Sequence, residues 1–528
     1  MWNIVEHPFG IVLSAVIAFI PLLWLLISLG IWKMAAHRSC VIGMLISMAL
    51  AVVGWKMPVD LVIKGAIDGA VLAIWPILWV IFAAIFTYNV TLKTGAMDKI
   101  KGVMANFSSD RRVQALLIAW GFGGFLEAAA GFGTAVAIPA AILISLGFNP
   151  FFAAVLCLIA NTVPVAFGAV GIPVVTLAKV ADVNLIKLTL DTAIQLTPFV
   201  IVIPLALIWI MTKSLAGLKG VVGMAFVAGI FFAVPQLLIA ALMGPELTAI
   251  VGSVVSMLGI VLWNKLSPPK KDWRFPNEIM ASKTNCVAKT SFKEQCVAWS
   301  PYILLFVLIL GTNSTVFPGL SKLLGAFQTS FSIYNGPGGK PISIAWILTP
   351  GTLIMIGALI GGVIQGASVC DIIGIFKKTC VQLQKTTITV VSIVALAKVM
   401  GYAGMVADIA VALAQSTGRF YPFIAPIIGA LGTFVTGSDT NSNVLFGALQ
   451  KQTAVQIGAD PVWITAANTT GATAGKMISP QSIAIATSAT GQAGTEGNIL
   501  RATVGYCLIY TILLGIWVYF INATHYFL

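Results

Sequence analysis

A run of polar side chains interrupts an otherwise apolar stretch near residue 440. Residues 436–443 read TGSDTNSN, so a carboxylate stands among hydroxyl and amide groups where apolar residues would be expected. Unsatisfied polar groups are expensive in hydrocarbon, so the segment predicts hydrogen bonds to a small polar solute, whose anionic group would face the N–H groups of a half-helix. A polar turn between helices is the alternative. The candidate residues are Ser438, Thr440, Asn441, Ser442 and Asn443, with Asp439 as the acid.

A second interruption, at residues 127–134, is rich in glycine. Its sequence EAAAGFGT has few side-chain donors, but glycine lets backbone amides approach a ligand, so Gly131, Gly133 and Thr134 are candidate binding residues. Tight helix packing would also explain the glycines. A carboxyl group at membrane depth is desolvated, which favours its neutral form and would let Glu127 or Asp439 exchange protons near neutral pH. Either acid could instead be a structural ion-pair partner.

Two Asn-Thr pairs stand directly before helix-loosening residues. One precedes Pro164 and the other precedes Gly471. Proline removes a helix hydrogen bond and glycine loosens the backbone, so both spans can unwind at these points. The polar side chains would then complete a cavity, and the candidates are Asn161, Thr162, Asn468, Thr469 and Thr470.

Lys398 and Lys476 are the basic residues expected at membrane depth. Either could pair with a substrate carboxylate or with an acidic residue, and Lys476 is taken as a candidate for substrate binding. Snorkelling of the ammonium group to the membrane surface is the alternative.

The sequence does not offer the residues that nucleotide binding, metal binding or enzymatic catalysis would need. No Lys-Ser or Lys-Thr follows the glycines at 121–133, so a phosphate loop is not indicated and transport would be driven by a gradient. The three histidines lie near the termini or in a loop, and the seven cysteines have no CxxC spacing, so neither a metal site nor a cofactor is expected. An enzyme would need a nucleophile or metal constellation that is missing here. A gated channel is the other alternative.

The composition indicates that these residues belong to a membrane protein. Of 528 residues, 59% are hydrophobic and 9% are charged, against roughly 25% charged in soluble domains. The net charge of +13 is scattered over connecting segments without a basic, aromatic-interleaved face, so the lipid bilayer is the expected partner and nucleic acid is not. The positive-inside rule puts both termini outside and the basic segments in the cytoplasm. These segments are residues 33–38, 93–112, 213–219, 264–297 and the loop expected at 377–385.

Apolar runs predict an all-α integral membrane protein of about twelve transmembrane helices. Two more segments, residues 113–148 and 421–448, are long enough to enter the membrane but are interrupted midway, and we interpret each as a re-entrant helical hairpin. Irregular backbone at membrane depth is tolerated only beside protein or a water-filled cavity. The two interruptions therefore indicate a solute site.

The two hairpins align when one is shifted by 309 residues, which pairs Gly123 with Gly432 and Glu127 with Thr436. The Asn-Thr segments align as well. The segment before the first hairpin is basic, whereas its counterpart at 403–421 has only Asp408 and Arg419, so the copies should lie inverted in the membrane, as repeats of secondary transporters do. The predicted organisation is repeat 1 at 1–217, with five spans and a hairpin, a linking helix pair at 218–263, a cytoplasmic loop at 264–297, and repeat 2 at 298–528.

These motifs resemble the lactate permease family, which includes L-lactate and glycolate permeases of bacteria. The resemblance covers nearly the whole chain. It implies proton symport of L-lactate, with D-lactate and glycolate, across the bacterial cytoplasmic (inner) membrane. It also implies kinship with elevator-type ion transporters, which are often dimeric and can bind sodium between hairpin and broken helix. Its segments are WGFGGFLEAAAGFGTAVAIPAAIL from Trp120, LIANTVPVAFGAVGIPV from Leu158, GTFVTGSDTNSNVLF from Gly432 and NTTGATAGKMISPQSIAIA from Asn468.

The leading hypothesis is a proton-coupled symporter for small 2-hydroxymonocarboxylate anions. The hairpin tips and Asn-Thr breaks would enclose the substrate, and Glu127 and Asp439 would carry the proton. The alternative is a sodium-coupled carboxylate symporter of the same architecture, in which both acids would belong to an ion site.

Overall fold

The computed structural model describes residues 2–32, 34–105, 107–131, 133–269, 271–275, 291–312, 316–492 and 495–525. Lys33, Lys270 and residues 276–290 of the expected cytoplasmic segments therefore lie outside the described residues, as does Phe132 of the first hairpin tip.

The first half of the chain is helical, with short π-helical or 3-10 segments labelled η. Its elements are α1 (Ile11–Leu25), η1 (Leu26–Ile31), α2 (Ala36–Val53), α3 (Val59–Leu72), η2 (Ala73–Leu78), α4 (Trp79–Lys93), α5 (Ala96–Ala105), α6 (Arg111–Ala115), η3 (Leu116–Phe122), α7 (Gly123–Ala129), α8 (Thr134–Ser145), α9 (Pro150–Ala160), η4 (Pro164–Phe167), α10 (Gly168–Ala181), α11 (Leu185–Thr212), η5 (Leu215–Leu218), α12 (Val222–Leu242) and α13 (Thr248–Leu266).

The second half has the same character, apart from one small sheet. Its elements are α14 (Phe292–Ala298), α15 (Ser300–Thr312), α16 (Pro318–Gly325), β1 (Gln328–Phe331), β2 (Ile342–Ala345), α17 (Pro350–Ile364), α18 (Val369–Ala403), α19 (Met405–Thr417), η6 (Gly418–Phe420), α20 (Tyr421–Thr436), α21 (Asp439–Ile457), α22 (Pro461–Lys476), α23 (Pro480–Ala489) and α24 (Glu496–His525).

Among the described residues, ten helices are long and apolar enough to cross a membrane, or eleven if the bent pair α14 and α15 forms one span. The expected number was about twelve. Three expected spans do not pass as single helices of this length: α17 has 15 residues, α22 has 16, and α14 and α15 are bent, whereas a straight crossing takes about 20. The segment Met405–Thr436, whose last part was expected to belong to the second hairpin, adds one candidate span. A multi-pass membrane protein is nevertheless the architecture that these lengths and compositions describe.

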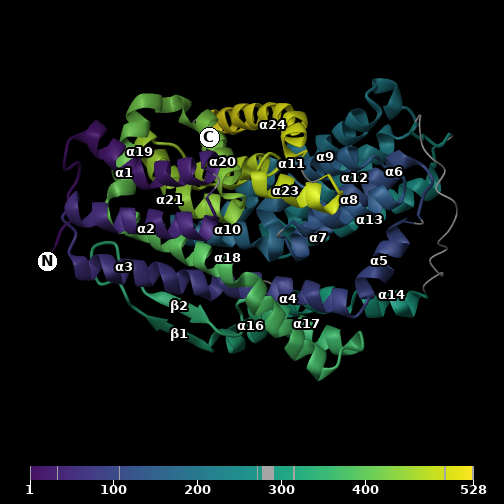
Figure 1. The fold of residues 1–528 in the computed structure, drawn as a ribbon, viewed down its shortest axis with the longest axis horizontal. Helices are drawn as coiled ribbons and strands as arrows, with labels where there is room; N and C mark the ends of the chain where they lie inside the picture. Colours follow the sequence, from purple (N-terminus) through teal and green to yellow (C-terminus); the bar gives the residue numbers. More distant parts are fainter. Residues whose placement is uncertain are drawn as a thin grey trace.

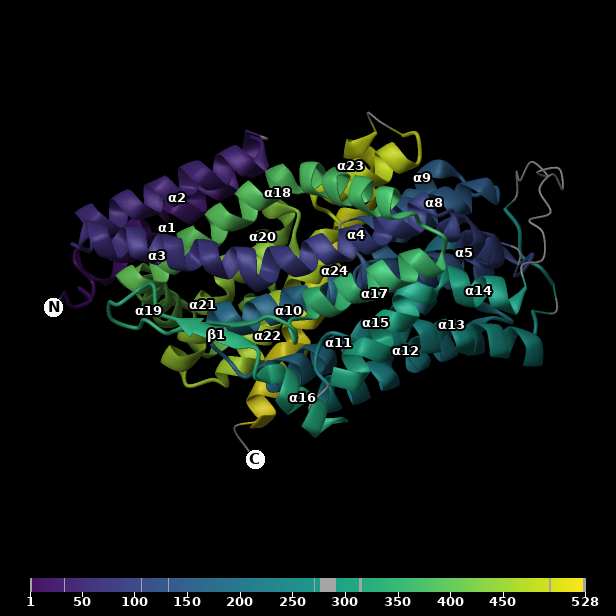
Figure 2. The ribbon, with the colours of Figure 1, turned by 90° about the horizontal axis from the view of Figure 1, so that it is seen from below.

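Two groups of helices pack side by side (Figures 1 and 2). In the first group, α18 lies against α2, α3 and α4. In the second group, the helical hairpin α20–α21 packs against α22, α10 packs against α21, and α11 to α13 cover the hairpin that runs from α6 to α8.

The basic segment expected as a loop at 377–385 is helical instead. Lys377, Lys378 and Lys385 all lie within α18, which has 35 residues. At 1.5 Å per residue, that helix is about 52 Å long and exceeds the roughly 30 Å hydrocarbon core. The basic residues can therefore remain helical and still reach the aqueous phase, so the expectation of a loop was wrong.

The small antiparallel sheet also departs from the all-helical prediction. Gln328 of β1 pairs with Ala345 of β2. In the connection between the strands, Tyr334 stacks on Tyr402 of α18 with ring centroids 3.8 Å apart, and Lys340 Nζ lies 2.7 Å from Asp182 Oδ2. The strand edges need water or another strand, which is consistent with a position outside the hydrocarbon.

Helices α20 and α22 touch backbone to backbone. A Cβ atom on Gly429 would lie 2.0 Å from the Asn468 carbonyl oxygen, and one on Gly471 would lie 1.9 Å from the Pro426 carbonyl oxygen. Small residues allow such approaches between membrane helices. The second hairpin is therefore tightly joined to the helix that carries the second Asn-Thr pair.

A buried ion pair fixes the start of the first hairpin. Arg112 Nη2 lies 2.6 Å from Asp110 Oδ2, and Arg112 Nη1 donates to the Gly217 carbonyl oxygen at 2.8 Å. Asp110 also accepts from the Trp273 N–H at 3.1 Å. These contacts attach the hairpin to the α11–α12 connection and to the segment that follows α13.

Candidate functional site

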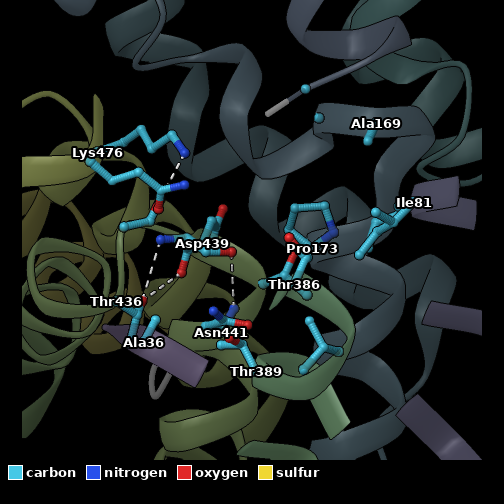
Figure 3. Close-up of a pocket in the computed structure, with 18 of the residues that line it drawn as sticks. Ala36, Ile81, Ala169, Pro173, Thr386, Thr389, Thr436, Asp439, Asn441 and Lys476 are labelled. Carbon is cyan, nitrogen blue, oxygen red and sulfur yellow. Dashed lines mark hydrogen bonds between the residues drawn. The ribbon is translucent and has the colours of Figure 1, made fainter. Parts of the chain in front are cut away.

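A cavity of about 360 Å³ lies between the two groups of helices. Its volume falls near the lower end of the roughly 300–1,000 Å³ of ligand pockets. Both hairpin tips, α10 and the α22–α23 break form one part of the wall, and α2, α4 and α18 form the other (Figure 3). Seven of the predicted site residues line it: Glu127, Gly131, Ser438, Asp439, Thr440, Asn441 and Lys476.

The second hairpin tip is a short, internally bonded turn. Helix α20 ends at Thr436, and Gly437 follows in the left-handed region with φ of 72°, which glycine adopts without strain. Ser438 then caps α21 by accepting a hydrogen bond from the Asn441 N–H at 3.4 Å. The Thr436 hydroxyl donates to the Ser438 carbonyl oxygen at 3.0 Å. The turn thus presents polar groups to the cavity from a fixed backbone.

Asp439 is the first residue of α21 and only 3% exposed. The Thr469 hydroxyl lies 3.1 Å from Asp439 Oδ1 and 3.0 Å from Oδ2, so one hydroxyl proton is shared between two acceptors. The helix N-terminus adds a favourable field for a negative charge. Asp439 is therefore held in place while it lines the cavity.

Lys476 is the last residue of α22 and extends toward the second hairpin tip (Figure 3). Its Nζ donates to the Gly437 carbonyl oxygen at 2.9 Å. The positive charge acts on both Glu127 and Asp439, although no ion pair within 4.0 Å joins them in the part of the chain that the structure describes. The ammonium group is thus placed to receive an anion.

The first hairpin brings Glu127 to the cavity lining. Gly131 follows with φ of 61°, and Gly168 at the start of α10 leaves space for the acid, because a Cβ there would lie 2.9 Å from Glu127 Oε1. Beyond Gly168, the backbone of Ala169 and Val170 is left-handed, with φ of 43° and 60°. Such φ values are rare for alanine and strained for a β-branched residue, so the surrounding packing must impose this break.

The other predicted residues lie outside the cavity lining. The Asn443 amide donates to Thr469 and accepts from Asn468, at 3.1 and 2.9 Å, so these residues form a buried network. Ser442 and Thr470 hydroxyls donate to Gly429 O and Gln195 Oε1. Thr134 and Thr162 hydroxyls donate to backbone carbonyl oxygens. Asn161 is buried, and a Cβ on Gly133 would meet Ile485.

Lys398 belongs to a different cluster. Its Nζ lies 3.4 Å from Asp68 Oδ2, and that same oxygen accepts a hydrogen bond from the Tyr402 hydroxyl at 2.8 Å. Of the two pairings considered for Lys398, the structure shows the one with an acidic residue.

Several lining residues were not among the sequence candidates. Those with polar side chains are His37 of α2, Lys385, Thr386 and Thr389 of α18, Thr436 at the second hairpin tip and Gln481 of α23. The polar spacing at 385, 386 and 389 inside a long helix was a signal that could have found three of them, since residues three and four apart share a helix face.

The cavity lining combines two lysines, Lys385 and Lys476, with two carboxyl groups and several hydroxyl and amide groups. Such a set can bind a small anion that also carries a hydroxyl group, and it can exchange a proton. Within the described ranges, no group of three or more His, Cys, Asp or Glu side chains could hold a metal ion.

Several known proteins are similar to this chain. An L-lactate permease of Streptococcus iniae is 43% identical over 86% of this chain and 93% of its own. The glycolate permease GlcA of Escherichia coli is 36% identical and an L-lactate permease of Bacillus subtilis 37%, each over 98% of this chain and 97% of its own. A solved structure of the Neisseria gonorrhoeae efflux pump MtrF covers 86% of this chain and 83% of its own, at 13% identity and a TM-score of 0.45.

The family described as L-lactate permease matches residues 14–524, which includes both hairpins, both Asn-Thr pairs and Lys476. With relatives named as permeases along nearly its whole length, the chain belongs to the L-lactate permease family.

Proposed function

We propose that this protein imports L-lactate, and also D-lactate and glycolate, by proton symport across the bacterial cytoplasmic membrane. The proposal rests on one observation: Lys476, Glu127 and Asp439 line the same cavity. The substrate carboxylate would pair with Lys476, and the 2-hydroxyl group would bond to polar groups of the second tip such as Ser438 or Asn441. Relatives named for lactate and for glycolate support this substrate class.

Competition for the charge of Lys476 would couple the proton to the substrate. In the empty cavity, this cation acts on both carboxyl groups. A substrate carboxylate beside Lys476 would offset its charge, so a carboxyl group would hold a proton more strongly while substrate is bound. Since linkage is reciprocal, protonation would raise substrate affinity by the same factor. Anion and proton would thus move together.

We also infer alternating access between two inverted repeats, at 1–217 and 298–528. Two segments of 35 residues, Val59–Lys93 and Val369–Ala403, support the inference, because a short helix, a hairpin, a broken helix and a long helix follow each of them in the same order. The cavity lies between the hairpin group and the group around α18, where an elevator-type movement would carry it from one face to the other.

The cavity mouth would face the cytoplasm in this conformation. Ala35, His37 and Lys385 line it, and they belong to segments that the positive-inside rule assigns to that side. This orientation places both termini outside.

Uptake into proteoliposomes tests the proposal. Purified protein should accumulate labelled L-lactate under an inward proton gradient in sodium-free buffer, and Lys476→Met should lose most of this uptake. Replacing sodium with choline at constant pH should change nothing. Uptake that requires sodium would favour the sodium-coupled alternative, and the absence of both gradient-driven uptake and lactate counterflow would reject transport of this substrate.

A further inference from the structure

Asn161 follows α9 at the first break, and its environment is unusual. Only 2% of the residue is exposed, it does not line the cavity, and both side-chain amide atoms lack a hydrogen-bond partner among the described residues. An unsatisfied buried polar group costs about 1–3 kcal/mol. A side chain with only a structural role would be expected to bond to its surroundings.

The counterpart in the second break is bonded on both sides. Asn468 donates to Asn443 Oδ1 at 2.9 Å and accepts from Gln450 Nε2 at 3.1 Å. The two Asn-Thr pairs therefore have the same sequence but different surroundings. Only the first Asn is left with free hydrogen-bonding capacity.

Glu127 provides the complementary group. Its Oε2 is buried and has no hydrogen-bond partner in the part of the chain that the structure describes, and the residue is 4% exposed. Asn161 is near enough to act on the Glu127 carboxyl group, yet no hydrogen bond of acceptable geometry joins the two in this conformation.

Charged neighbours of Glu127 come from other elements. Lys476 and Asp439 act on it across the cavity. Within the described chain, six elements pack against α7, and three of them, α8, η3 and η4, have no ionisable side chain. The other three each contribute one: Cys157 in α9, Lys179 in α10 and Lys265 in α13. Among uncharged side chains, the Asn161 amide acts on the Glu127 carboxyl group, and an amide can both donate and accept.

We propose that Asn161 is a positioning residue for the proton on Glu127 rather than a substrate ligand, and this inference rests on the proposed proton symport. The amide oxygen accepts from the neutral carboxyl group, and the amide N–H donates to the ionised one. An amide offers both functions after a simple rotation, whereas a sodium ion would satisfy acceptors only. Asn161 and Glu127 together therefore suit the binding of a proton better than the binding of a sodium ion.

The test compares Asn161→Ala with Asn161→Ser and with the matched control Asn468→Ala. Loss of the amide donor removes a partner of the ionised carboxyl group, so Asn161→Ala should move the pH of half-maximal lactate uptake upward by about one to two units. Asn161→Ser retains a donor and an acceptor, so its pH of half-maximal lactate uptake should return most of the way to the wild-type value. Half-saturation of lactate counterflow should stay within about threefold of wild type.

Thermal unfolding in detergent gives a second readout. Asn161→Ala should melt at or above the wild-type temperature because it removes an unpaired polar group, whereas Asn468→Ala should melt lower because it breaks a bonded network. An unchanged pH profile with counterflow half-saturation raised more than about tenfold would make Asn161 a substrate ligand and overturn the inference. The inference would also be overturned if the wild type shows counterflow but Asn161→Ala changes none of the measured quantities. If the wild type itself shows no counterflow, the transport proposal is rejected.

Discussion

Replacing Gly471 with alanine should separate α20 from α22. The new Cβ would stand 1.9 Å from the Pro426 carbonyl oxygen and 2.5 Å from Pro426 Cα. Carbon and oxygen need about 3.3 Å even in a close C–H···O contact, so the helices must part by more than about 1 Å. Both obstructing atoms belong to the backbone, and no change of rotamer can relieve the clash.

The magnitude follows from two opposing terms. Overpacking costs about 1–3 kcal/mol and sometimes more, whereas alanine recovers about 1 kcal/mol of helix propensity. Because the overlap is severe, we expect a net loss of about 2 kcal/mol, or about 30-fold in the ratio of folded to unfolded protein. The displacement should also loosen the contacts of Asn468 and Thr469, and should therefore slow lactate exchange.

Unfolding in mixed dodecylmaltoside and SDS micelles, followed by tryptophan fluorescence, measures this loss. Gly505→Ala in α24 is the matched control, because its Cβ would have nothing within 4 Å, and it should leave stability unchanged or raise it by up to about 1 kcal/mol. If Gly471→Ala were as stable as Gly505→Ala, the close approach of α20 and α22 would be refuted.

In the same assay, Arg112→Met should cost about 3–5 kcal/mol because it leaves Asp110 buried without its cation, and adding Asp110→Asn should recover part of the loss. Burial raises the pKa of Glu246, in the α12–α13 connection, to about 7. The folded state therefore holds this proton more tightly than the unfolded chain, so wild-type stability should fall between pH 4.5 and 7, and Glu246→Gln should flatten that fall in melting curves recorded across this range. If Asp439 carries the proton, Asp439→Asn should abolish proton-driven uptake while counterflow survives, whereas unchanged driven uptake would remove Asp439 from coupling.

The acids and the cation of the cavity were predictable because each interrupts an apolar run. Glu127, Asp439 and Lys476 were recognisable without knowledge of which helices touch, since a charge at membrane depth requires a compensating role. The glycines beside them marked the turns. Local composition was therefore sufficient to locate both hairpin tips.

The direction of each neighbouring side chain was not predictable. With 3.6 residues per turn, consecutive polar residues of α21 point to different sides, so Asp439 and Thr440 reach the cavity while Ser442 and Asn443 bond to protein. His37 and Thr386 also line the cavity, and this was not predicted because it depends on contacts between elements far apart in the chain. Only tertiary packing decides which face of α18 meets the site.

Two of the contacts that hold the β hairpin between α16 and α17 differ in strength. Tyr334 is stacked on Tyr402, whereas Lys340 and Asp182 form a pair whose side chains are 69% and 61% exposed. Such a pair contributes at most about 1 kcal/mol and weakens with salt. Stacked rings can slide, so the proposed movement of α10 relative to α18 would act mainly on the ion pair. If that movement limits transport, raising the ionic strength should accelerate it by at most about fivefold and should leave affinity in the cavity unchanged.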